Sequence, residues 1–553
     1  MTTDSVQAAA TPSDEAAPRA SRPGPVPEAA PAGRVEPEGT PVGHQTVLVL
    51  DFGGQYTQLI ARRVRDNRVY CEIHPFDYPI AEIRRRRPIG LILSGGPQSV
   101  FAPGAPLAGA ELFALGIPVL GICYGMQVIA HVMGGAVEPA VHREYGRAEV
   151  SVVEAGCLFA GLGATETVWM NHGDLVHRPP AGFRATASTP SAPIVAFEDA
   201  ARGIFAVQFH PEVSHTVSGA EMLRNFLFGP CGARGDWRLA SFLDEAVAQV
   251  RARVGPGRVI SALSGGVDSS VMAALLNRAV SERATAVFVD TGVLRKDEAV
   301  QVVRALEGGL GVPVRAVDAR ARFLAALAGV AEPEEKRKVI GRVFIEVFRA
   351  EAAKLAGVGF LAQGTLYPDV IESESVKGPS AVIKTHHNVG GLPKDLGFEL
   401  IEPLRFLFKD EVRQLGRELG LPEELIRRHP FPGPGLAVRI LGEVTAERVA
   451  LLQEADAIFL AELRESGWYD RVSQAFAVLL PVRSVGVMGD FRTYENVVAL
   501  RAVDTHDFMT ADWSPLPHEL LGRVASRIVN EVKGVNRVVY DVTSKPPATI
   551  EWE

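Results

Sequence analysis

The chain has few cysteines, no excess of basic residues and no long apolar segment. Its four cysteines, Cys71, Cys123, Cys157 and Cys231, are scattered without a Cys-x-x-Cys pair, which argues against a disulfide framework or a zinc site. Lys and Arg number 57 against 65 Asp and Glu, and the net charge of −8 gives no indication of a nucleic-acid partner. No apolar run approaches the roughly 18 residues that a membrane-spanning helix needs, so we expect no membrane contact. Free thiols suit a reducing cytoplasm, where we expect the protein.

The length of 553 residues predicts three or four domains. Residues 1–42 are rich in Ala and Pro and lack an apolar period, which predicts a disordered tail. From residue 46 onward, apolar strands bounded by glycine alternate with helical patterns, which predicts α/β domains with mostly parallel sheets. Changes in composition near residues 230 and 430 divide this part into domains of residues 43–235, 236–430 and 431–553, the last a small α+β domain.

One candidate site is centred on Cys123. It stands in Gly-Ile-Cys-Tyr-Gly-Met-Gln, after an apolar run and before a helical pattern, which predicts a strained strand-to-helix turn that exposes the sulfur. His210, at the end of an apolar strand, is the candidate base, and Glu212 can orient its imidazole. The amides of Gly95 and Tyr124 would stabilise an oxyanion. A structural thiol and an ordinary strand-end histidine are the alternative, but the two sequence contexts together favour a thiolate that attacks the amide of glutamine.

A second candidate site is a glycine-rich turn that precedes a helical pattern. Such a turn presents backbone N–H groups and hydroxyls to phosphates at a helix N-terminus. The predicted loop consists of Ser264, Gly265, Gly266, Val267, Asp268, Ser269 and Ser270. The chain has no Gly-x-x-x-x-Gly-Lys-[Ser/Thr] motif, so this is not a kinase-type P-loop. The loop resembles the pyrophosphate loop of the N-type ATP pyrophosphatases, and Asp268 among phosphate ligands implies a cation, for which we expect Mg²⁺.

An acyl-transfer site and an ATP site on one chain indicate a glutamine amidotransferase, in which nitrogen from an amide attacks a group that ATP has activated. The order of Cys-Tyr-Gly-Met-Gln, His-Pro-Glu and Ser-Gly-Gly-Val-Asp-Ser resembles the GMP synthetases, which convert XMP to GMP. The resemblance covers about residues 45–553. Its most specific stretches are residues 51–56, 383–388, 430–435 and 545–553.

The resemblance implies a class I amidotransferase domain with the triad Cys123, His210 and Glu212, an ATP pyrophosphatase domain, and a third domain that forms a homodimer. Residues 369–393 are polar and poorly periodic, which is typical of a functional lid. The family match places on this lid Asp369, Glu372, Lys384, His386 and His387. It places at the XMP site Arg337, Gln474, Asp490, Lys545 and Glu551. XMP, glutamine and ATP are then the substrates, and adenyl-XMP is the intermediate.

Two other kinds of function remain open at this point: an enzyme with another acceptor, and a protein without catalysis. The same pyrophosphatase loop serves tRNA thiolation and asparagine synthesis, but the first favours extra cysteines and a basic face and the second an N-terminal nucleophile, and we find none of these. A non-catalytic nucleotide sensor is the alternative from another class. The complete triad and loop argue against it, and a glutaminase assay separates the two.

Overall fold

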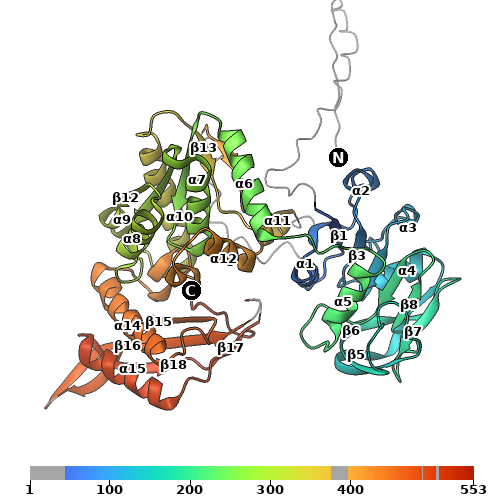
Figure 1. The fold of residues 1–553 in the computed structure, drawn as a ribbon. Helices are drawn as coiled ribbons and strands as arrows, with labels where there is room; N and C mark the ends of the chain where they lie inside the picture. Colours follow the sequence, from blue (N-terminus) through green and yellow to red (C-terminus); the bar gives the residue numbers. More distant parts are fainter. Residues whose placement is uncertain (1–43, 375–396, 489, 506–507, 509) are drawn as a thin grey trace, which may run out of the picture. The chain divides into compact units, whose positions relative to one another are not determined.

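The computed structural model describes residues 44–374, 397–488, 490–505, 508 and 510–553. The predicted N-terminal tail and the predicted lid residues Lys384, His386 and His387 lie outside these residues. Three sheets follow one another along the described chain (Figure 1).

The first sheet has nine strands in the order β2-β1-β3-β4-β9-β8-β7-β5-β6. Its parallel half agrees with the sequence prediction and consists of β1 (Thr46–Asp51), β2 (Tyr70–Pro75), β3 (Gly90–Leu93), β4 (Val119–Ile122) and β9 (Ile204–Val207). The antiparallel half was not predicted as strands and consists of β5 (Ala136–Val152), β6 (Thr165–Arg178), β7 (Arg184–Ser188) and β8 (Ala196–Asp199).

Helices cover both faces of the parallel half. Val47 and Val49 belong to one apolar cluster and Leu48 and Leu50 to another, because successive side chains of a strand point to opposite faces. The helices of this region are α1 (Thr57–Asp66), α2 (Ile80–Arg86), α3 (Ala110–Phe113), α4 (Tyr124–Val132) and α5 (Gly219–Phe228).

The second sheet has five parallel strands in the order β12-β11-β10-β13-β14. The sequence patterns predict the parallel arrangement and the first four strands along the chain, but not β14. The strands are β10 (Arg258–Leu263), β11 (Ala284–Asp290), β12 (Val314–Asp318), β13 (Val358–Ala362) and β14 (Glu399–Ile401). The helices are α6 (Leu239–Val254), α7 (Val267–Val280), α8 (Glu298–Leu310), α9 (Arg320–Leu327), α10 (Pro333–Ala352), α11 (Tyr367–Glu374), α12 (Lys409–Glu418) and α13 (Glu423–Ile426).

The predicted lid segment, residues 369–393, needs a correction at its start. Helix α11 extends to Glu374, so the first six of these residues are helical. Tyr367 and Val370 are buried at 3% and 6% exposure, and this apolar anchoring on one helix face explains why a segment with a weak sequence period still forms a helix.

The third sheet is built on the antiparallel hairpin of β15 (Gln474–Met488) and β16 (Phe491–Asp504). Strand β17 (Asp512–Trp513) pairs with β16 antiparallel, and β18 (Val535–Tyr540) pairs with it parallel. Helices α14 (Ala446–Glu465) and α15 (His518–Glu531) cover the sheet. One continuous apolar cluster contains Ile260 and Phe348 from the second region together with Phe459, Ala477 and Val524 from the third.

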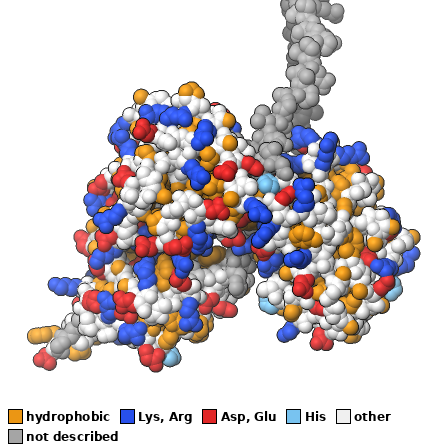
Figure 2. All heavy atoms as spheres, viewed as in Figure 1, with side chains coloured by type: hydrophobic (Ala, Val, Ile, Leu, Met, Phe, Trp, Pro, Cys, Tyr) orange, Lys and Arg blue, Asp and Glu red, His pale blue; other side chains and the backbone are white. Residues whose placement is uncertain are grey.

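Charged side chains of both signs are mixed on the face of the molecule seen in Figure 2. Figure 2 shows Lys and Arg interspersed with Asp and Glu on this face, as the near balance of 57 basic and 65 acidic residues leads us to expect. Within the described residues, no helix combines the length and the apolar character that crossing a membrane requires.

Candidate active sites

Cys123 occupies the sharp turn between β4 and α4 that its sequence predicts. The residue is only 5% exposed, however, so the turn does not expose the sulfur to solvent as predicted, because the apolar side chains around it cover it. Its backbone angles are φ 53° and ψ −105°, a region that non-glycine residues rarely adopt and that tight packing must hold in place. Two glycines permit this packing. A Cβ at Gly125 would lie 2.4 Å from the Leu93 carbonyl oxygen, and one at Gly121 would lie 2.6 Å from Cδ1 of Ile129.

His210 and Glu212 form a buried pair behind the predicted nucleophile. The Nδ1 of His210 lies 2.7 Å from Oε1 of Glu212, and the two residues are 4% and 0% exposed. Burial opposes the charged imidazole, but the charges of Glu212 and Cys123 outweigh it and raise the pKa of His210 well above its ordinary value. The His210 Nε2 is buried and has no hydrogen-bond partner within the described part of the chain. This nitrogen is therefore available to the thiol and to substrate.

Gly95 lies where the triad residues converge. A Cβ built on Gly95 would be 3.1 Å from Cε1 of His210 and 3.7 Å from Cβ of Cys123. The structure therefore brings Gly95, Cys123 and His210 together. Across the described residues, neither the Gly95 amide nor that of Tyr124 donates to another backbone group. Both predicted oxyanion donors thus remain available beside the sulfur.

Two further residues contact the sulfur of Cys123 and were not predicted. The thiol donates to the Asn171 carbonyl at 3.6 Å, and the Gln208 side-chain amide donates to the sulfur at 3.8 Å. Gln208 stands two residues before His210, so its position beside a predicted base was a usable signal. Asn171 lies on β6, a strand that the sequence patterns did not indicate. The Tyr56 ring packs edge-on against His210 with centroids 5.0 Å apart.

The predicted phosphate loop lies between β10 and α7 and is closed by its own serines. The Ser264 amide donates to Oγ of Ser269 at 3.2 Å, and that hydroxyl donates to the Gly266 carbonyl at 3.1 Å. Gly265 has a φ of +80°, which favours glycine at this position. Helix α7 begins within the loop at Val267, so the amides of its first turn face the space above the loop.

Asp268 is the carboxylate of this loop. Its Oδ1 is buried and has no hydrogen-bond partner among the described residues, while its Oδ2 lies 3.7 Å from the Lys409 ammonium. An unsatisfied carboxylate oxygen fits a cation ligand. In the part of the chain that is described, no group of three or more His, Cys, Asp or Glu side chains is arranged to hold a metal. Any Mg²⁺ here would need ligands from the bound phosphates as well as from Asp268.

Two of the predicted XMP residues are in direct contact. Glu551 accepts hydrogen bonds from the Gln474 amide at 2.8 Å and from the Arg439 guanidinium at 2.8 and 3.1 Å. Arg337 donates to the backbone oxygen of Glu553, 2.6 Å away, and therefore lies near the same terminal segment. Arg439 is fully buried and was not predicted, because its ion-pair partner lies 112 residues away in sequence.

Lys545 and Asp490 are placed differently. The Lys545 ammonium donates to the Phe508 carbonyl at 2.7 Å. Asp490 is exposed in the turn between β15 and β16, whereas Gln474 begins β15 at the other end of the hairpin. A strand of this length separates them by roughly 45 Å. The structure therefore does not bring Asp490 to Gln474 within one chain, and a contact of Asp490 with XMP stays a prediction.

Of the predicted lid residues, Asp369 and Glu372 lie in α11. The Asp369 carboxylate accepts the Leu366 amide at 2.9 Å, an interaction at the start of the helix. Their predicted role in adenylylation stays a prediction.

The chain matches three family models. They are described as glutamine amidotransferase class-I over residues 48–229, NAD synthase over residues 238–340, and GMP synthase C terminal domain over residues 461–552. A "GMP synthase [glutamine-hydrolyzing]" of Carboxydothermus hydrogenoformans is 57% identical over 507 residues, which are 92% of this chain and 99% of that protein. A protein of the same description from Phenylobacterium zucineum is 58% identical over 514 residues, with the same two shares. A solved structure from Thermoplasma acidophilum, described as a GMP synthase subunit, is 36% identical, covers 34% of this chain and 95% of its own, and has a TM-score of 0.31.

Proposed function

Because the chain belongs to the family of glutamine-hydrolysing GMP synthases, we propose that it makes GMP from XMP, ATP and glutamine. ATP adenylylates the C2 oxygen of XMP, and ammonia from glutamine displaces AMP. Pyrophosphate and glutamate are the other products. The observation that carries this proposal is the presence, on one chain, of a Cys–His–Glu site and a separate phosphate loop, each next to parallel strands of its own sheet.

The thiol site releases the ammonia. His210 takes the proton of Cys123, and the thiolate attacks the side-chain carbonyl of glutamine. The amides of Gly95 and Tyr124 stabilise the oxyanion, and the imidazolium returns its proton to the leaving ammonia. Glu212 stabilises that imidazolium through the contact at 2.7 Å. Water then takes the place of ammonia at the acyl carbon, which frees glutamate and Cys123.

The phosphate loop holds ATP. Its first-turn amides and serine hydroxyls bind the pyrophosphate end, where the positive end of the α7 dipole favours negative charge. Mg²⁺, held by Asp268 and the phosphates, would neutralise charge on the leaving pyrophosphate. Closure of a lid with Asp369, Glu372, Lys384, His386 and His387 would complete this site.

XMP binds beside the C-terminal segment in this proposal. Arg337 and Lys545 suit its phosphate, and Gln474 and Glu551 suit the purine edge. The contacts of Glu551 with Arg439 and Gln474 support this role, because they fix a carboxylate in one orientation before substrate arrives.

We further propose domains of residues 43–235, 236–430 and 431–553 and a homodimer formed through the last. The support for the dimer is a set of exposed apolar side chains on the β15–β16 hairpin, at 47–78% exposure. They are Val482, Val485, Val487, Phe491 and Tyr494. Analytical ultracentrifugation tests this proposal: Phe491→Asp should shift a dimer to monomer. The free thiol that the reaction requires suits a cytoplasmic location.

The decisive experiment is an amination assay with XMP, ATP and Mg²⁺ and with either glutamine or ammonium as nitrogen donor. Cys123→Ala should abolish the glutamine reaction and leave the ammonium reaction largely intact, because the thiolate serves only to release nitrogen. Asp268→Ala should abolish both. Equal loss with both donors in Cys123→Ala would refute the division of labour, and AMP formation at a near-normal rate in Asp268→Ala would refute the ATP site.

A further inference from the structure

Arg428 contacts the phosphate loop from outside. Its Nη1 donates to the Gly265 carbonyl at 3.0 Å and to Oε1 of Glu298 at 3.2 Å. Glu298 is only 4% exposed, and a Cβ on Gly265 would lie 3.4 Å from the same Oε1, so this carboxylate touches the loop as well. Arg428 therefore bridges a loop carbonyl and a buried anion.

The contact with Gly265 determines which way the next amide points. In a planar trans peptide the C=O and the following N–H point in opposite directions. When Arg428 holds the Gly265 carbonyl, the N–H of Gly266 must face the other side. The only bond that this N–H makes to a described residue is a long one, 3.4 Å to Oγ of Ser264. Because both residues are glycines, this peptide is free to flip without such a restraint.

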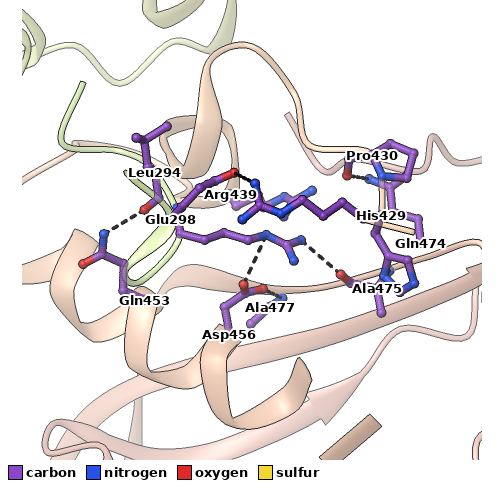
Figure 3. A network of polar contacts seen from close by, with 12 residues as sticks. Leu294, Glu298, His429, Pro430, Arg439, Gln453, Asp456, Gln474, Ala475 and Ala477 are labelled. Atoms are coloured by element: carbon purple, nitrogen blue, oxygen red, sulfur yellow. Dashed lines mark hydrogen bonds and ion pairs between the residues drawn. The ribbon is translucent and has the colours of Figure 1, made fainter. Parts of the chain in front are cut away.

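The two residues after Arg428 reach the proposed purine site. The His429 ring stacks on Tyr469 with centroids 4.0 Å apart, and its Nδ1 accepts the Ala475 amide at 3.2 Å. Burial lowers the pKa of His429 to about 4, so the ring is neutral and its Nε2 donates to the Tyr469 carbonyl at 2.9 Å. The Pro430 carbonyl accepts the Gln474 amide at 3.3 Å (Figure 3).

A second connection joins the same two places. The backbone amide of Arg295 donates to Oε2 of Glu298 at 3.0 Å, and its guanidinium donates to the Ala475 carbonyl at 3.3 Å. Asp456 lies 3.5 Å from that guanidinium and accepts the Ala477 amide at 3.0 Å (Figure 3). Glu298 at the phosphate loop and the first residues of β15 are thus linked twice, through the half-buried side chains of Arg428 and Arg295.

We propose that residues 428–430 are a rigid strap that couples the ATP and XMP sites, with Arg428 as a positioning residue for the Gly265–Gly266 peptide. This inference rests on the proposed function. Phosphate bound at the loop holds the Gly265–Gly266 peptide in one orientation, which strengthens the hydrogen bond from Arg428 to the Gly265 carbonyl. Through its contacts the strap then also restrains Gln474 and Glu551. Each substrate then binds more tightly when the other is present, because coupling between two sites is reciprocal.

Full-length wild type, Arg428→Gln, Arg428→Lys and Arg427→Gln test this coupling. Arg427 is the matched control, since it is adjacent but pairs with exposed Glu423 and Asp470 at 2.8 and 3.3 Å. The Kd for XMP is measured with and without α,β-methylene-ATP, which cannot be cleaved to AMP. We expect XMP to bind at least about fivefold more tightly with the analogue in wild type and in Arg427→Gln, and about equally in Arg428→Gln.

Turnover with ammonium gives an independent measurement. Arg428→Gln should raise the KM for ATP about tenfold or more, and Arg428→Lys should recover part of the loss because it keeps a charged donor. A wild type without coupling, or an Arg428→Gln protein with wild-type coupling and ATP KM, overturns the inference. So does equal damage in Arg427→Gln and Arg428→Gln. A wild type that forms no GMP refutes the proposed function instead.

Discussion

Replacing Glu212 by Gln is the sharpest single test of the thiol site. The substitution keeps the shape of the side chain but removes a charge that lies 2.7 Å from the imidazole and is completely buried. A hydrogen bond to a charged group contributes about 1.5–3 kcal/mol. Since 1.36 kcal/mol corresponds to a factor of ten, the population of the imidazolium–thiolate pair should fall about 10- to 150-fold. Glutamine hydrolysis should fall by at least that factor.

The pH profile of glutamine hydrolysis should shift in a defined direction in Glu212→Gln. Glu212 and Cys123 raise the pKa of His210, so its charged form is fully present below the ordinary histidine pKa and is lost only as pH rises through the raised value. Without the Glu212 charge this loss begins at a lower pH. The alkaline limb of the glutaminase profile in Glu212→Gln should therefore move toward neutral pH.

The assay measures glutamate release and ammonium-dependent GMP formation in the same preparation across pH. The ammonium reaction reports whether the variant is folded, because it does not use the thiol. Glu221→Gln, an exposed glutamate of α5, controls for the loss of one negative charge. A Glu212→Gln protein with unchanged turnover and an unchanged alkaline limb would refute the assignment of Glu212 as the orienting partner.

Three other substitutions have outcomes that the contacts specify. Gly95→Ala should slow glutamine hydrolysis about tenfold and spare the ammonium reaction, which kinetics with the two nitrogen donors will measure. The reason is that the new Cβ would lie 3.1 Å from Cε1 of His210 and displace this catalytic side chain. Glu411→Leu should lower the free energy of unfolding by about 3–5 kcal/mol in denaturant titrations, because it leaves the buried Arg65 guanidinium, 3.0 Å from Glu411, without its counter-charge. Asp410→Asn, which removes an exposed ion pair with Arg62, should have little effect. Lys545→Ala should weaken XMP binding by about 1.5–3 kcal/mol in equilibrium titrations, and unchanged affinity would remove this lysine from the site.

The sequence predicted the parts of the fold that have a strong local signal. Strands such as Val47–Leu50 are continuous apolar runs, and a parallel sheet that is buried on both faces requires such runs. The turn at Cys123 was predictable because the glycines beside it mark a place with no room for a side chain. A Cβ on Gly125 would lie 2.4 Å from the Leu93 carbonyl oxygen.

The remainder depended on contacts between distant residues. Strands β5 and β6 have one solvated face, so their apolar residues alternate with charged ones. They therefore contain no continuous apolar run of the kind that marks the buried parallel strands. Asn171 reaches Cys123 only through that hairpin. The ion pair of Glu551 with Arg439 could not be predicted from the sequence either, because Arg439 lies in no motif that is typical of a binding site.

The stretch of Pro and Gly at residues 430–435 shows why composition alone is ambiguous. Such residues mark linkers, but they also mark places where backbones pass very close to one another. Gly435 has a φ of +64°, and a Cβ there would lie 2.3 Å from the Val293 carbonyl oxygen, which accepts the Leu436 amide at 2.7 Å. The segment is therefore packed directly against the turn that leads to Arg295. A stretch that fixes the chain this firmly can transmit a restraint from Arg428 to Gln474, whereas a flexible linker could not.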